Sequence, residues 1–158
     1  MTKADLLALA LDDFLAISSE VEAAAVVSAD GLPMASALPP NVEEDRLAAM
    51  SAALLTLGER AASELGKGEL AQVFIEGPKG HVILMAAGPD SVLVAVTSRG
   101  AKVGLVLFEM RRIAERVGAV MTAGVSDAVE TPAGLAVVGE HEPPAPAEPP
   151  ATSMASWH

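Results

Sequence analysis

Residues 43–65 constrain the fold most, because this run of 23 residues contains no proline and one internal glycine, Gly58. Apolar residues recur in it at the spacing of an amphipathic helix. This stripe consists of Leu47, Met50, Leu54, Leu57, Ala61 and Leu65. We expect the stripe to face the protein's own core.

The other side of this predicted helix carries small side chains where a solvated helix would carry Lys, Glu and Arg. Small side chains let a second surface approach closely, so this side is the predicted partner-binding face. It consists of Ala48, Ser51, Ala52, Leu55, Glu59 and Ala62. On this assignment, Ala52→Arg disrupts association and leaves the fold intact.

The composition favours a single associating domain. A chain of 158 residues fits one domain, and 51% of its residues are hydrophobic, but only 3% are aromatic. A core rich in alanine buries little apolar area per residue, so association would supply further burial. The formal charge of −11 argues against nucleic acid and anionic membranes as partners.

Other compositional features exclude whole classes of site. The chain has no cysteine, which excludes disulfides, zinc–thiolate sites and thiol nucleophiles. No apolar run approaches the roughly 20 residues that span a bilayer, and the start of the chain does not resemble a signal peptide. We therefore expect a cytosolic protein without cofactors, metal or direct membrane insertion.

The remaining patterns predict the order of elements. Helices are expected at 4–18, 43–65 and 102–121, and strands at 23–28, 32–38, 70–76, 81–87 and 91–97. Asp30-Gly31 is a hairpin signal, and Asn41 is a candidate helix cap. Short turns make neighbouring strands antiparallel. The predicted fold class is α+β, in the order α-β-β-α-β-β-β-α, with a five-stranded antiparallel sheet and helices on both faces.

The strands are expected to differ in position. Pro33 cannot donate a ladder hydrogen bond, so strand 32–38 is assigned to an edge. Strand 91–97 is apolar at nearly every position and is assigned to the centre. Strand 70–76 is the candidate for the second edge, where it would pair with another copy of the chain. Its expected dimer residues are Leu70, Gln72, Val73, Phe74 and Ile75.

The composition changes after residue 121. Residues 122–158 hold six of the eleven prolines and five acidic residues, without any Lys or Arg. We therefore expect a domain over 1–121 and an acidic, Pro-rich disordered tail over 122–158.

The candidate chemical motifs are weak. The segment 66–71 fits a loose G-x-G-x-x-A dinucleotide pattern, but it closes a helix and opens a strand, the reverse of what phosphate binding needs. His81 has no second ligand or carboxylate beside it in the sequence and is expected to be an ordinary half-exposed residue. Arg99 is expected to be an exposed loop charge, and Trp157 has no supported role. No catalytic constellation is predicted.

The order of elements resembles the Roadblock domain family, with its Roadblock/longin-like fold. The resemblance rests on the hairpin VVSADGLPMAS (26–36), the Ala/Leu-rich helix after it, and VGLVLFEMRRIAERVGAVM (103–121). This family includes the Roadblock dynein light chains and the MglB-type regulators of Ras-like GTPases. The resemblance covers residues 4–121 and excludes the tail.

The resemblance implies a homodimer in which the third strands pair and the central helices lie side by side. It also implies that a Ras-like small GTPase docks on those helices, with the chain contributing no catalytic residue of its own. An alternative is a structural adaptor that holds a signalling or motor complex together without affecting GTP hydrolysis. A third class, a small-molecule sensor or enzyme with a pocket on the sheet, has the least support.

Overall fold

The computed structural model describes residues 1–129, and side chains through residue 123. Residues Met1–Asp127 form one compact unit, and the second unit, Ala128–His158, lies almost entirely outside the described residues. The elements are α1 (Lys3–Ile17), β1 (Val21–Ser28), β2 (Pro33–Ala37), α2 (Glu44–Glu64), β3 (Gln72–Gly77), β4 (Gly80–Ala86), β5 (Ser91–Ser98) and α3 (Val103–Val129). The predicted order and fold class are confirmed.

The five strands form one antiparallel sheet in the order β2-β1-β5-β4-β3. The predictions for the strand positions are confirmed: β5 is central, and β2 and β3 are the edges. β5 is central because its alternating Val and Leu side chains pack on both faces of the sheet.

The Asp30-Gly31 turn joins β1 to β2, as predicted. Gly31 has a φ of 86°, a left-handed conformation that suits glycine. A Cβ placed on Gly31 would lie 3.5 Å from the Ala49 Cα and 3.6 Å from the Ala52 Cβ of α2. The hairpin tip therefore packs directly on α2.

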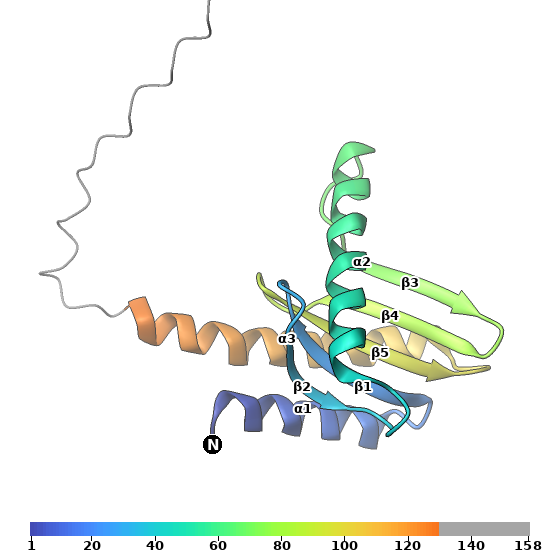
Figure 1. The fold of residues 1–158 in the computed structure, drawn as a ribbon, viewed down its shortest axis with the longest axis horizontal. Coiled ribbons are helices and arrows are strands. Elements are labelled where there is room, and N and C mark those ends of the chain that lie inside the picture. Colours follow the sequence, from blue (N-terminus) through green and yellow to red (C-terminus); the bar gives the residue numbers. More distant parts are fainter. Residues whose placement is uncertain (130–158) are drawn as a thin grey trace, which may run out of the picture. The chain divides into compact units, whose positions relative to one another are not determined.

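Helices cover both faces of the sheet (Figure 1). α1 and α3 share one face, where Leu7, Phe14 and Met110 are fully buried. A contact between Arg116 and Asp13, 2.6 Å from Nη1 to Oδ2, links these two helices. Among the described elements, α2 alone covers the other face, over β1, β4 and β5. None of the helices in the described part combines the length and hydrophobicity needed to cross a membrane.

α1 begins with a capping box. The Thr2 hydroxyl accepts a hydrogen bond from the Asp5 backbone N–H, and the Asp5 carboxylate accepts one from the Thr2 backbone N–H. The hydrogen bond from the Thr2 backbone N–H to the carboxylate, and to a smaller extent the Thr2 side chain, lower the pKa of Asp5 below its usual value of 3.8.

Three local predictions were wrong. α2 begins after Glu43, which makes no side-chain cap hydrogen bond, so Asn41 is not the cap. Leu70 precedes β3 instead of belonging to it. α3 does not end at 121 but continues to Val129, because residues 122–129 contain no proline. The rest of the predicted tail, 130–158, lies outside the described residues.

Candidate protein-interaction surface

Strand β3 is an open edge of the sheet. Within the described residues, 1–129, it pairs with β4 only, in a register that places Val73 opposite Leu84 and Phe74 opposite Ile83. The Phe74 and Ile75 side chains are 40% and 39% exposed. Gln72 and Val73 are half-buried. This strand therefore presents unpaired backbone groups beside exposed apolar side chains.

The side of α2 that was predicted to bind a partner mostly faces the chain's own sheet, and much of the side predicted to face the core is exposed. Four of the six residues assigned to a partner are buried against the chain's own sheet: Ala48, Ser51, Ala52 and Leu55. Only Glu59 is exposed, and Ala62 is half-buried. The small side chains instead allow α2 to lie close to β1 and to the Gly31 turn.

Part of the apolar stripe of α2 consequently points away from the sheet. We use the name outer α2 face for three exposed residues of the stripe and the exposed alanine beside them: Met50, Leu57, Ala61 and Ala53. Met50 is 51% exposed and Leu57 is 61% exposed. Leu47 and Leu54 lie at the margin, where they are half-buried against the core. The helix is thus apolar on two sides, and the part of the chain that the structure describes covers only one of them.

A contact between α2 and the start of β3 joins the outer α2 face to the open edge. A Cβ placed on Gly58 would lie 2.9 Å from Leu70 Cδ2 and 3.1 Å from Val73 Cγ2. The one glycine inside α2 therefore lets Leu70 and Val73 pack against the helix backbone. Leu70, although outside the strand, positions β3 beside α2.

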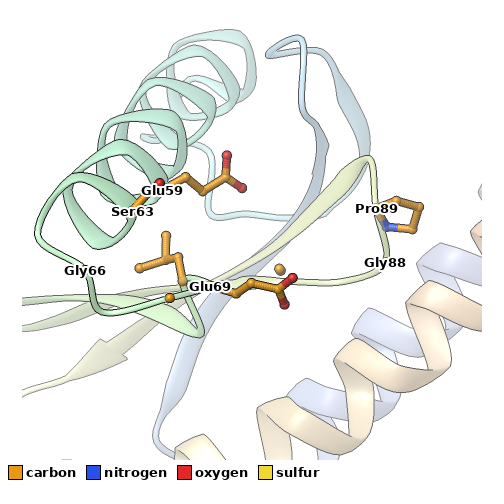
Figure 2. A pocket seen from close by; sticks show the side chains of 9 residues that line it. Glu59, Ser63, Gly66, Glu69, Gly88 and Pro89 are labelled. Carbon is orange, nitrogen blue, oxygen red and sulfur yellow. The ribbon is translucent and has the colours of Figure 1, made fainter.

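A hollow of about 740 Å³ lies between the C-terminal end of α2 and the β4–β5 turn (Figure 2). The acidic side chains of Glu59 and Glu69 border it, together with Ser63 and the glycines on either side. Its lining contains no histidine, lysine or cysteine. The part of the chain that the structure describes also has no group of three or more residues suited to hold a metal ion.

The glycines of the dinucleotide-like segment end α2, as predicted. Gly66 and Gly68 have φ values of 69° and 87°. The Gly66 N–H donates to the Ser63 carbonyl, and the Lys67 N–H donates to the Ala62 carbonyl. The segment therefore terminates a helix and provides no helix N-terminus for a pyrophosphate.

His81 is more buried than the sequence predicted, since only 12% of its side chain is exposed. Its Nδ1 atom lies 3.1 Å from Thr97 Oγ1, and its ring centre lies 5.1 Å from that of Phe74. Its Nε2 atom lies 3.9 Å from Glu76 Oε1. The sequence alone does not reveal this grouping, because the partners lie on the two strands that flank β4, Phe74 and Glu76 on β3 and Thr97 on β5.

Comparison with known protein families identifies the family to which this fold belongs. The Roadblock/LC7 domain profile matches residues 7–97, from α1 to β5. The chain belongs to the Roadblock/LC7 domain family. A Roadblock/LC7 domain from Streptomyces avermitilis is 33% identical, with a TM-score of 0.55, over 70% of this chain and 96% of that domain.

Other similar proteins extend the comparison. An uncharacterized protein of Methanocaldococcus jannaschii is 37% identical over 99 residues, which are 63% of this chain and 86% of that protein. Myxococcus xanthus MglB is 18% identical with a TM-score of 0.72, over 78% of this chain and 92% of MglB. The gliding protein MglB of Thermus thermophilus has a TM-score of 0.67 at the same identity, covering 76% of this chain and 91% of MglB. At these identities the two MglB structures establish similarity of fold alone.

The Roadblock/LC7 match includes both parts of the candidate surface, α2 and β3, and ends before α3. The outer α2 face and the β3 edge therefore lie inside the family's domain.

Proposed function

We propose that this Roadblock/LC7 chain forms a homodimer through β3 and the outer α2 face, and that the dimer docks and regulates a small Ras-like GTPase. The observation that carries the proposal is the position of the open β3 edge, which packs beside a helix whose apolar stripe faces away from its own sheet. These two features meet at Gly58, Leu70 and Val73.

The β3 edge supports pairing between two copies. An edge strand with exposed apolar side chains is a template for another strand, and proteins usually protect such edges with charge, proline or a covering segment. Within β3 the only charged residue is Glu76, near its end. Pairing of two β3 strands would continue the sheet and cover Phe74 and Ile75.

The outer α2 face supports a helix–helix or helix–GTPase contact. Burial of apolar area contributes about 25 cal/mol per Å², so covering Met50 and Leu57 would stabilise an assembly. Contiguous exposed apolar side chains on one helix face are a feature of interaction sites. This face replaces the six small-side residues as the proposed platform. Glu59 lies on the opposite side of the helix, where it borders the hollow beside the β4–β5 turn.

Docking of a GTPase is supported by family membership together with the similarity of fold to MglB. In this proposal the chain acts by binding and changes the GTPase's own active site. The competing proposal is an adaptor that uses the same surface to assemble a complex and leaves GTP hydrolysis unchanged.

The test is a pull-down with purified Ras-like GTPases, starting with any that is encoded alongside this chain, each loaded with GDP or with a non-hydrolysable GTP analogue. We expect binding that depends on the nucleotide and is lost in Leu57→Arg. The rate of phosphate release then separates the two roles, because only a regulator changes it. Absence of binding in both nucleotide states would contradict the proposed docking.

A further inference from the structure

The tip of the β1–β2 hairpin and α2 border a groove on the side of the helix away from β3. A Cβ placed on Gly31 would lie 3.5 Å from the Ala49 Cα, whereas Leu70 contacts α2 at Gly58. Ala49 and Gly58 lie nine residues apart, or about two and a half helical turns, so they project from opposite sides of α2. The β1–β2 turn and β3 accordingly flank the helix (Figure 1). We call the space of about 440 Å³ beside the turn the hairpin groove.

We infer that the hairpin groove is the part of the α2 surface that contacts the GTPase, whereas the β3 side of α2 contacts the second copy. The groove would receive an apolar side chain of the GTPase that stands next to a lysine or arginine. The inference rests on the proposed function and assigns its two contacts to two sides of one helix.

The lining of the groove selects this chemistry. Ala49, Ala53 and Leu57 line it and are exposed. The Thr56 hydroxyl also lines it, but it donates to the Ala52 carbonyl oxygen at 3.0 Å and is already paired.

Asp30 supplies the charge of the groove. Among the described residues that line the groove, it is the one with a charged side chain. No ion pair joins it to another side chain within residues 1–123. An apolar floor beside one carboxylate complements an apolar side chain beside a cation.

Hydrogen bonds hold the hairpin tip in place before any partner arrives. The Ser28 N–H donates to the Leu32 carbonyl oxygen at 2.9 Å, and the Leu32 N–H donates to Ser28 Oγ at 3.1 Å. The Gly31 N–H donates to the Ser28 carbonyl oxygen, and the Ala29 N–H donates to the Asp90 carbonyl oxygen in the β4–β5 turn. A surface ordered in advance loses little conformational entropy when it binds.

The order of the strands keeps a second copy away from the groove. The sheet order β2-β1-β5-β4-β3 places β1 three strand spacings, or about 14 Å, from the β3 edge. A copy that pairs with β3 therefore meets α2 on its Gly58 side. Ala61 lies one turn from Gly58 on that side, whereas Ala53 lies one turn from Ala49 on the groove side. The groove thus stays accessible in the dimer.

The experiment titrates full-length variants with the Ras-like GTPase that binds in the pull-down, loaded with a non-hydrolysable GTP analogue, by calorimetry. Ala53→Arg fills the groove and is expected to raise the dissociation constant of the GTPase about tenfold, because overpacking a contact costs about 1–3 kcal/mol. In sedimentation equilibrium this variant is expected to keep the mass of two chains. Ala61→Arg, the same substitution on the β3 side, is expected to lose the dimer.

A second pair of variants tests the charge. Asp30→Lys is expected to raise the dissociation constant of the GTPase about fivefold, as the loss of one exposed ion pair does. Asp12→Lys makes the same change of charge on α1, which covers the other face of the sheet, and is expected to leave the constant unchanged. Equal effects in the two variants would contradict a cation beside Asp30.

The outcomes separate the inference from the proposed function. A GTPase that binds Ala53→Arg as tightly as the parent protein would overturn the inference and leave the proposed docking intact. Loss of the dimer in Ala53→Arg would also overturn it, because the groove would then belong to the contact between copies. If no GTPase binds the parent protein in either nucleotide state, the proposed docking fails, and the inference fails with it.

Discussion

A Cβ placed on Gly58 of α2 would lie 2.9 Å from Leu70 Cδ2, at the point where the chain enters β3. This contact links α2, which carries the outer α2 face, to β3, which is the open edge of the sheet. The position of the outer α2 face therefore depends on the position of the β3 edge.

Gly58→Ala tests this coupling. Alanine favours a helix over glycine by about 1 kcal/mol. Overpacking against Leu70 and the stiff Val73 side chain opposes that gain by about 1–3 kcal/mol. We expect Gly58→Ala to lower the free energy of unfolding by about 1 kcal/mol, measured by urea denaturation. Gly104→Ala is the matched control, because a Cβ there meets no atom within 4 Å, and it is expected to be neutral or stabilising. Equal effects in the two variants would contradict the coupling.

Ala52→Arg tests which side of α2 is the inner one. Ala52 is buried beside the Gly31 turn, so an arginine there has neither space nor a partner for its charge. We expect a loss of more than about 3 kcal/mol in the free energy of unfolding. Loss of association by a variant with unchanged thermal stability would restore the assignment made from the sequence.

Leu57→Arg tests the outer side of the same helix. Leu57 is 61% exposed, so its replacement changes the stability of an isolated chain by no more than about 0.5 kcal/mol. We expect an unchanged circular dichroism spectrum together with loss of the dimer in sedimentation velocity. Leu57→Met, which keeps the apolar surface, is expected to retain the dimer. An Arg variant that still dimerises would exclude the outer α2 face from the interface.

Asp5→Asn tests the capping box of α1 through pH. The folded-state pKa of Asp5 lies below its ordinary value of 3.8, because the Thr2 backbone N–H donates a hydrogen bond to the carboxylate, with a smaller contribution from the Thr2 side chain. Its contribution is therefore present above pH 3.8 and is lost as the pH falls through the lowered pKa. We expect Asp5→Asn to melt at a lower temperature than the parent at pH 7, with a difference that shrinks toward pH 3. The difference should be smaller at pH 7 when Thr2 is already alanine. A difference independent of pH would contradict this account.

The sequence predicted the architecture well because its signals are local. Asp30-Gly31 fixes one hairpin, Pro33 indicates an edge, and the apolar run of β5 indicates the centre of the sheet. Each of these signals depends on a few adjacent residues and the backbone conformations open to them.

The functional surface was harder to predict because α2 is apolar on two sides. Periodicity identifies an apolar stripe but does not say whether it faces the chain's own sheet or another molecule. Ala48 and Ala52 pack inward because the Gly31 turn approaches the helix backbone, a contact between segments about 20 residues apart. The grouping of Glu76, His81 and Thr97 similarly depends on strand order and register.

The central claim is that β3 and the outer α2 face together form an interface between two copies of this chain. Sedimentation equilibrium of the full chain, compared with Ile75→Lys on the exposed edge, tests it most directly. We expect the mass of two chains for the parent protein, and the mass of one folded chain for Ile75→Lys. A parent protein with the mass of one chain across micromolar concentrations, or a variant that still forms dimers, would contradict it.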